Sequence, residues 1–135
     1  MRIAVDAMGG DFAPQQAVLG SIMAAKEDKI ASVLVGRSGE INKELAQYPD
    51  YPRDLIAIKD AREVVEFTDH PAMAVRKKRD SSIVVANQLL KNGEVDAVIS
   101  AGNTGASMTA SLFILGRIPG IARPAIAIPL PTVKG

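Results

Sequence analysis

Short apolar runs alternate along the chain with longer amphipathic stretches. Apolar runs bounded by glycine or polar turns are typical of buried strands, and five segments fit: residues 2–7, 32–36, 55–59, 95–100 and 125–128. The stretches between most of them carry apolar residues at helical spacing, which predicts helices. The segment 61–67, AREVVEF, decides neither way, and both helix and extended chain stay open for it.

Five helices are predicted, over residues 14–26, 38–47, 71–80, 81–92 and 104–115. Pro14 and Pro71 suit the first turn of a helix, and Ser38 is a plausible cap. Gly93 is a typical helix stop. The last of the five is apolar on most faces, so we expect it to be buried.

Strands that alternate with helices at this spacing predict an α/β fold, with a parallel sheet covered by helices on both faces. In such a sheet ligands bind outside the carboxyl ends of the strands. This rule places two corners on one rim, MGGD after the first strand and AGNTGA after VDAVIS. Residues 1–135 read as one α/β domain. Because the pattern stops just after a strand without a closing helix, we expect the chain to be a fragment of a longer one.

Composition narrows the possible functions. Hydrophobic residues make up 47% and charged residues 23%, a globular balance. The net charge of +1 gives no field strong enough to imply nucleic acid, so an anion site would have to be local. The absence of cysteine excludes disulfides and thiolate chemistry within this sequence and fits a reducing cytoplasm. No apolar run approaches the length of a membrane span, and the N-terminus does not resemble a signal peptide.

The AGNTGA corner, residues 101–106, is the first candidate site. Glycine lets the backbone approach an anion, and the N–H groups at the start of a helix point toward it. Asn103 and Thr104 add side-chain donors. The alternative is a tight turn in which Gly102 and Gly105 only relieve crowding, and the pattern alone leaves the two interpretations about even.

The MGGD corner, residues 8–11, is the second candidate. Asp11 could face the crevice as a ligand or base, although an aspartate at this point more often caps the next helix. Asp6 falls late in the first strand and could be buried toward the same rim. Two aspartates without a histidine nearby make a poor metal site, so we expect no metal.

The run RKKRD supplies cations at Arg76, Lys77, Lys78 and Arg79. If the run is helical, Arg76 and Arg79 share a face and Lys77 and Lys78 point elsewhere, so at most half of the run can serve one pocket. Arginine suits bidentate contact with phosphate, and lysine supplies a point charge. A solvated helix end is the usual explanation of such a run.

His70 is the only histidine and comes just before Pro71. A pKa near neutrality would suit it to act as a general base. It could equally fix the entry of the chain into the helix. With no partner identified in the sequence, the structural interpretation is favoured.

Three ordered stretches, VDAMGGDFAP, HPAMAVRKKRDSSIVVA and DAVISAGNTGA, resemble the signature segments of the bacterial phosphate acyltransferases (phosphate:acyl-ACP acyltransferases). RIPGIARPAIA extends the likeness to residue 127, and only residues 28–62 match loosely. The resemblance implies a fold similar to that of the isopropylmalate dehydrogenase and phosphotransacetylase group. It also implies transfer of a fatty acyl group from acyl carrier protein to inorganic phosphate, which gives acyl phosphate for phospholipid synthesis.

Members of this family act as cytoplasmic homodimers that associate peripherally with the membrane, and their chain is considerably longer. The resemblance therefore implies that residues 1–135 are the N-terminal fragment. A missing C-terminal part would supply the other wall of the cleft, most of the dimer contact and the membrane-contacting helices. A chain of this length alone is expected to be a poor catalyst. No cofactor is expected.

The implied reaction needs a phosphate cradle, donors for the thioester oxyanion and a weak base, because phosphate itself is the nucleophile. Asp11 and the AGNTGA residues Gly102, Asn103, Thr104 and Gly105 are the expected phosphate ligands, with charge from Arg76, Lys78 or Arg79. His70 and Asn103 are the candidate catalytic residues, and His70 could orient phosphate or protonate the departing thiolate. The alternative function is a phosphate- or nucleotide-binding α/β module without acyl chemistry. Against its nucleotide version, the sequence contains no G-x-G-x-x-G fingerprint.

Overall fold

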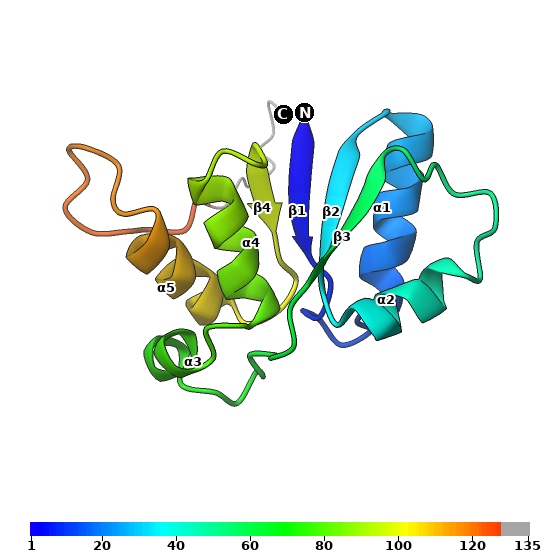
Figure 1. The fold of residues 1–135 in the computed structure, drawn as a ribbon. Coiled ribbons are helices and arrows are strands. Elements are labelled where there is room, and N and C mark those ends of the chain that lie inside the picture. The colour runs from blue at the N-terminus through cyan, green and yellow to red at the C-terminus, as the bar shows by residue number, and fades with distance from the viewer. Residues whose placement is uncertain (128–135) are drawn as a thin grey trace, which may run out of the picture.

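The computed structural model describes residues 1–127 and contains one four-stranded parallel sheet in the order β3-β2-β1-β4 (Figure 1). The strands are β1 (Arg2–Asp6), β2 (Ala31–Gly36), β3 (Ile56–Asp60) and β4 (Ala97–Ile99). All three neighbouring pairs run parallel. Parallel neighbours need crossover connections, which here are helical. The predicted α/β class is confirmed.

The helices are α1 (Gln15–Glu27), α2 (Ser38–Leu45), α3 (Pro71–Lys77), α4 (Ser82–Lys91) and α5 (Thr104–Ile114). Figure 1 shows α1 and α2 on one side of the sheet and α4 and α5 on the other. The short helix α3 packs against α5 rather than against a strand. Helices therefore lie on both faces of the sheet, as the alternation of strands and helices in the sequence predicts.

Side chains of β2 show how the sheet is buried on two faces. Val33 and Val35 point to one face, where they cluster with Leu89 of α4. Leu34, between them, points to the other face and clusters with Ile22 of α1. Strand side chains alternate between faces, so a central strand covered by helices on both sides is apolar throughout.

Coverage of the two faces is unequal at the β1–β4 side of the sheet. Ala4 of β1 faces α4 and is fully buried. Ile3, Val5 and Ile99 point to the opposite face, beyond α1, and line a groove there. Ile99 is 53% exposed. Within residues 1–127 the expected coverage on both faces is therefore complete over β2 and incomplete over β1 and β4.

The predicted helix over residues 71–80 is too long. Helix α3 ends at Lys77, and Lys78 has φ −90° and ψ 70°, outside the helical region. The carbonyl of Lys78 accepts hydrogen bonds from the Ser81 amide and hydroxyl, at 3.2 and 2.7 Å. These contacts turn the chain toward α4, so Arg79 lies beyond the helix.

Two further expectations about helices are wrong. Ser38 does not cap α2, because Arg37 holds the N-cap position and the Ser38 amide and hydroxyl both donate to Asp60 Oδ1. The helix α5 is not buried on most faces. Of its residues only Ala106 and Ala110 are buried, and Phe113 is 47% exposed. The reason is that α5 packs mainly against α3 and α4 and little against the sheet.

Residues 61–67, which the sequence left open, contain no helix. Glu63 forms a parallel bridge with Ser81, so this part of the chain is extended. The predicted strand at 125–128 lies partly outside the described residues, and residues 125–127 are not in a strand.

Candidate functional site

The two glycine corners meet at one edge of the sheet, as predicted. β1 and β4 are parallel neighbours, so the loops that follow them leave the sheet side by side. A Cβ atom at Gly9 would lie 2.9 Å from the Gly102 amide nitrogen, and one at Gly102 would lie 3.1 Å from Gly9 Cα. Such distances leave no room for a side chain at either position. Glycine here permits two backbone turns to touch.

A tie between Asp6 and Ser100 holds the two corners together. Ser100 Oγ donates to Asp6 Oδ2 at 2.7 Å, and the Gly102 amide donates to Ser100 Oγ at 3.2 Å. The amide of Met8 donates to the other carboxylate oxygen, Asp6 Oδ1. Asp6 is buried. A buried carboxylate that accepts several hydrogen bonds fixes its donors in place.

The sequence suggested that Asp6 is buried at the rim, but it did not identify Ser100. The available signal was the polar residue at the end of each of two apolar runs. Only the pairing of β1 with β4 turns those two positions into neighbours. The Gly102 amide is thereby engaged within the protein, and it is not a free donor for an anion.

Asn103 caps helix α5 and fastens a loop. Its Oδ1 accepts from the Ala106 amide at 2.9 Å. Its Nδ2 lies 3.3 Å from the carbonyl oxygens of Glu66 and Phe67, and 3.5 Å from that of Asp69. Both ends of the amide are occupied, so the Asn103 side chain positions residues 66–69 against the start of α5.

The first-turn amides of α5 remain the available donors. Among residues 1–127, no acceptor pairs with the N–H groups of Thr104 or Gly105. Thr104 is exposed, with its hydroxyl at the helix start. Unpaired N–H groups and the helix dipole together attract an anion. Gly105 also relieves crowding, since a Cβ there would lie 2.7 Å from Pro71 Cγ of α3.

The MGGD corner does not cap the next helix. Pro14 holds the N-cap position of α1, which has no side-chain cap, so the favoured interpretation of Asp11 is wrong. Asp11 is exposed and lines the end of the groove beside β1. Its carboxylate therefore lies at the rim without a structural role in α1.

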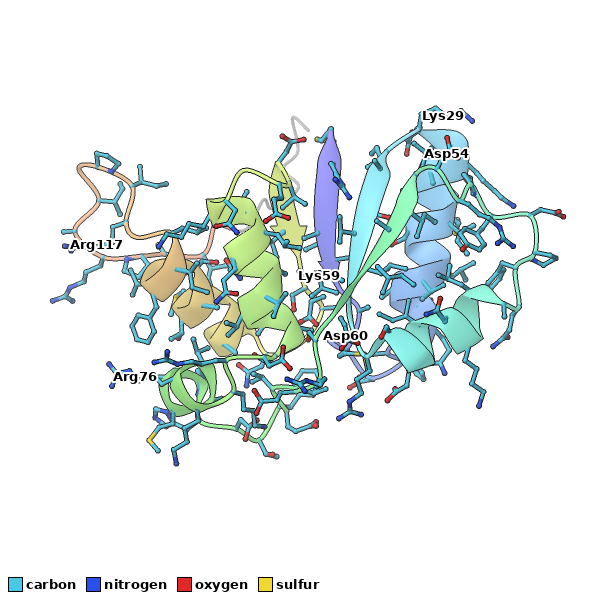
Figure 2. The ribbon with its side chains drawn as sticks, viewed as in Figure 1. Lys29, Asp54, Lys59, Asp60, Arg76 and Arg117 are labelled. Carbon is cyan, nitrogen blue, oxygen red and sulfur yellow. The ribbon has the colours of Figure 1, made fainter. Side chains whose placement is uncertain are left out.

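The cationic run is dispersed rather than gathered at the rim. The Arg76 guanidinium lies 5.3 Å from the centre of the Phe113 ring, near the C-terminal end of α5. Phe113 lies nine positions after Thr104 in the helix, which is about 13.5 Å at 1.5 Å per residue. Figure 2 shows Arg76 on the outer side of α3, away from the sheet. The expected shared face of Arg76 and Arg79 does not exist, because the helix ends between them.

Lys78 forms hydrogen bonds with the loop that precedes α3. Its Nζ donates to Asp69 Oδ2 at 2.5 Å and to the Val64 carbonyl at 2.8 Å. The hydrogen bond from Lys78, and then that from the Glu66 amide, lower the pKa of Asp69 below its usual value. Arg79 is exposed and has no ion pair or side-chain hydrogen bond within residues 1–127.

His70 stands at the N-cap position of α3 with an extended backbone. Its carbonyl accepts from the Ala74 amide at 2.9 Å, which begins the helix. The imidazole is exposed and makes no hydrogen bond with the residues that the structure describes. The backbone of His70 thus fixes the entry into α3, and its imidazole ring is free to contact a ligand.

Residues 1–127 contain neither a cluster of metal-ligating side chains nor a membrane-spanning helix. No group of three histidine, aspartate or glutamate side chains is placed to hold a metal ion. No helix in this range has the length and apolar character required to cross a membrane.

The fold and the rim define a class, the α/β proteins whose ligand site lies where glycine-rich turns follow neighbouring parallel strands. Within it, the chain belongs to the family described as fatty acid synthesis protein, whose pattern it matches over residues 1–135. It is 55% identical over 135 residues to the phosphate acyltransferase of Desulfitobacterium hafniense (strain DSM 10664 / DCB-2). It is 54% identical over 133 residues to that of Dictyoglomus turgidum and over 135 residues to that of Geotalea daltonii.

These likenesses cover nearly all of this chain and a smaller part of its relatives. The matches include 98% to 100% of the chain, but only 39% or 40% of each of the three relatives. The resemblance seen in the sequence motifs is confirmed. The chain therefore spans about 40% of the length of these relatives, which are named for an activity of the longer protein.

Proposed function

We propose that this chain is part of an enzyme that transfers a fatty acyl group from acyl carrier protein to inorganic phosphate, giving acyl phosphate for phospholipid synthesis. One observation carries the proposal. The unpaired N–H groups of Thr104 and Gly105 lie at a rim where β1 and β4 bring two glycine corners into contact. A tetrahedral oxyanion such as phosphate suits such a helix start. The printed name of the relatives, phosphate acyltransferase, agrees with a phosphate ligand.

The proposed chemistry makes phosphate the nucleophile. A phosphate oxygen attacks the thioester carbonyl carbon, an oxygen–carbon bond forms, and the carbon–sulfur bond breaks. The carrier leaves as a thiolate that takes up a proton. No cysteine or serine nucleophile is needed, so the reaction relies on positioning and on donors for the oxyanion. The exposed imidazole of His70 is the proposed proton donor to the thiolate.

We assign roles to the side chains according to whether they already form contacts within the protein. Asn103 acts by positioning the cradle, since its amide is occupied by the cap and by residues 66–69. Arg79 is the proposed phosphate cation, because Arg76 stacks on Phe113 and Lys78 pairs with Asp69. Asp11 is an exposed carboxylate at the rim, and its negative charge opposes a direct contact with phosphate.

The remaining parts of the proposal concern the protein as a whole. We place it in the cytoplasm as a homodimer that associates peripherally with the membrane, with acyl carrier protein as donor. In this proposal the dimer contact and the membrane contact belong to the part of the protein that corresponds to the unmatched region of the relatives. The chain of 135 residues alone should therefore turn over slowly or not at all.

The deciding assay supplies acyl-ACP and phosphate and follows free carrier thiol. It is run on this chain alone and on a chimera in which the chain replaces the matching part of the Desulfitobacterium hafniense relative. We expect phosphate-dependent thiol release from the chimera. Phosphate binding without thiol release would instead identify a phosphate-binding module. Full turnover by the chain alone would show that the site is complete within 135 residues.

Phosphate titration of the chimera tests the cation. Arg79→Ala removes a charge-assisted hydrogen bond, worth about 1.5–3 kcal/mol or roughly 10- to 150-fold in affinity. Lys77→Ala is the matched control, because Lys77 is exposed at the end of α3. If Lys77→Ala weakens phosphate binding more than Arg79→Ala does, the assignment of Arg79 is wrong.

A further inference from the structure

The uncovered part of the sheet forms one wall of an apolar groove. Its floor is made by Ile3 and Val5 of β1 and Ile99 of β4, and helix α1 forms its side. The groove has a volume of about 580 Å³. Parallel sheets are nearly always covered on both faces, so an open face over β1 and β4 requires an occupant.

Four of the five α1 residues that line the groove are small, and the fifth, Gln16, lies at the N-terminal end of the helix. Ala17, Gly20, Ser21 and Ala24 follow one another at spacings of three, one and three, which places them on one face of the helix. The stretch from Ala17 to Ala24 presents no long side chain to the groove, which allows the axis of a second helix to approach to the usual 8–10 Å. The wall of the groove is therefore shaped for a helix that packs alongside α1.

Two buried hydroxyl groups in the same groove have no partner among residues 1–127. Ser21 and Ser32 both line it, are 5% and 4% exposed, and no atom in the described part of the chain forms a hydrogen bond with either Oγ. Buried hydroxyls are nearly always paired, so these two indicate that a polar group belongs opposite them. An acyl chain could fill the apolar floor, but it would leave both hydroxyls unpaired. A polypeptide offers apolar and polar groups together.

We infer that the groove is an interaction surface for a helix from the part of the protein that the longer relatives possess outside the matched region. This chain spans about 40% of the length of such a relative, so ample chain exists to supply it. The helix would set small or apolar residues against α1 and the strand floor, and polar groups against Ser21 and Ser32. The inference concerns assembly and does not depend on the acyltransferase reaction.

A thiol-labelling experiment tests this inference, since the sequence contains no cysteine. Gly20→Cys places a thiol in the groove, and Gly39→Cys places one in α2, outside it. Both positions are exposed, and a Cβ at either would meet no atom within 4 Å. Each change is made in this chain alone and in the chimera with the Desulfitobacterium hafniense relative, and labelling at each site is followed by peptide mass spectrometry.

We expect the two sites to label at similar rates in the chain alone. In the chimera, Gly20→Cys should label at least about tenfold more slowly, while Gly39→Cys keeps its rate, because a packed helix opens only rarely. Equal labelling of both sites in the chimera would overturn the inference. So would protection of Gly20→Cys that appears only when a fatty acid is added, since that outcome identifies a lipid site.

A second variant guards against misfolding of the cysteine variants. Ser21→Ala removes one unpaired hydroxyl, so the chain alone should keep or slightly gain thermal stability. In the chimera the same change should lower the melting temperature, because the polar group opposite loses its partner. A melting temperature that is unchanged or raised in both proteins would show that nothing in the longer protein pairs with Ser21.

Discussion

The corner that follows β4 and the segment that follows α3 differ in what holds their polar groups. At the corner, the Gly102 amide and both ends of the Asn103 side chain bond to neighbouring elements. After α3, Lys78 bonds to the preceding loop, whereas Arg79 is exposed. The pairing of parallel strands in the sheet fixes the position of residues that directly follow a strand. The position of residues that follow a short helix depends on where that helix ends.

The close contact at the corner should be the most sensitive feature of the molecule. Gly9→Ala would place a Cβ 2.7 Å from Asp6 Oδ2 and 2.9 Å from the Gly102 amide nitrogen. Neither neighbour can move without breaking the tie to Ser100, so we expect a loss of about 1–3 kcal/mol in unfolding free energy. Urea unfolding measures it. Gly39→Ala, in open space on α2, is the control and should be neutral or stabilising.

Loss of the Asn103 side chain should come next in size. Asn103→Ala removes the cap of α5 and the contacts to residues 66–69, and we expect a cost of about 1–2 kcal/mol. Asn103→Asp keeps the acceptor for the Ala106 amide and removes only the donor. In urea unfolding, Asn103→Asp should recover much of the loss. If Asn103→Ala left stability unchanged but abolished phosphate binding, Asn103 would be a ligand rather than a positioning residue.

The ion pair of Lys78 and Asp69 should appear in the pH dependence of stability. The pKa of Asp69 is lowered, first by the hydrogen bond from Lys78. A lowered folded-state pKa stabilises the fold above the unfolded-state value, near 3.8, and this stabilisation is lost as the pH falls through the folded-state value. Asp69→Asn should therefore flatten the loss of stability below about pH 4. Stability measured by urea at pH 7 and pH 3 checks this, and an unchanged slope would contradict it.

The smallest effect is expected at Arg76. Its exposed contact with the Phe113 ring should contribute about 0.5–1 kcal/mol, and its guanidinium lies far from Thr104. Arg76→Ala should slightly lower the melting temperature and leave phosphate affinity unchanged. A phosphate affinity reduced tenfold or more by this change would show that α3 moves to bring Arg76 to the rim.

The parallel α/β architecture and the common rim of the two corners could be predicted from the amino-acid sequence. Those inferences rest on the alternation of short apolar runs with helices, which depends on local spacing and on strand polarity. They hold within a few residues for β1 through β4.

Which polar groups are free to bind a ligand could not be predicted, because it depends on contacts between distant parts of the chain. The Asp6–Ser100 tie joins residues 94 positions apart, and the contact of Lys78 with Val64 and Asp69 depends on how one loop folds back. The end of α3 is set by the Ser81 contacts with the Lys78 carbonyl, which outweigh the helical pattern of RKKRD. Hydrogen bonds between distant segments leave no periodic trace in a sequence, because each needs only one donor and one acceptor brought together by the fold.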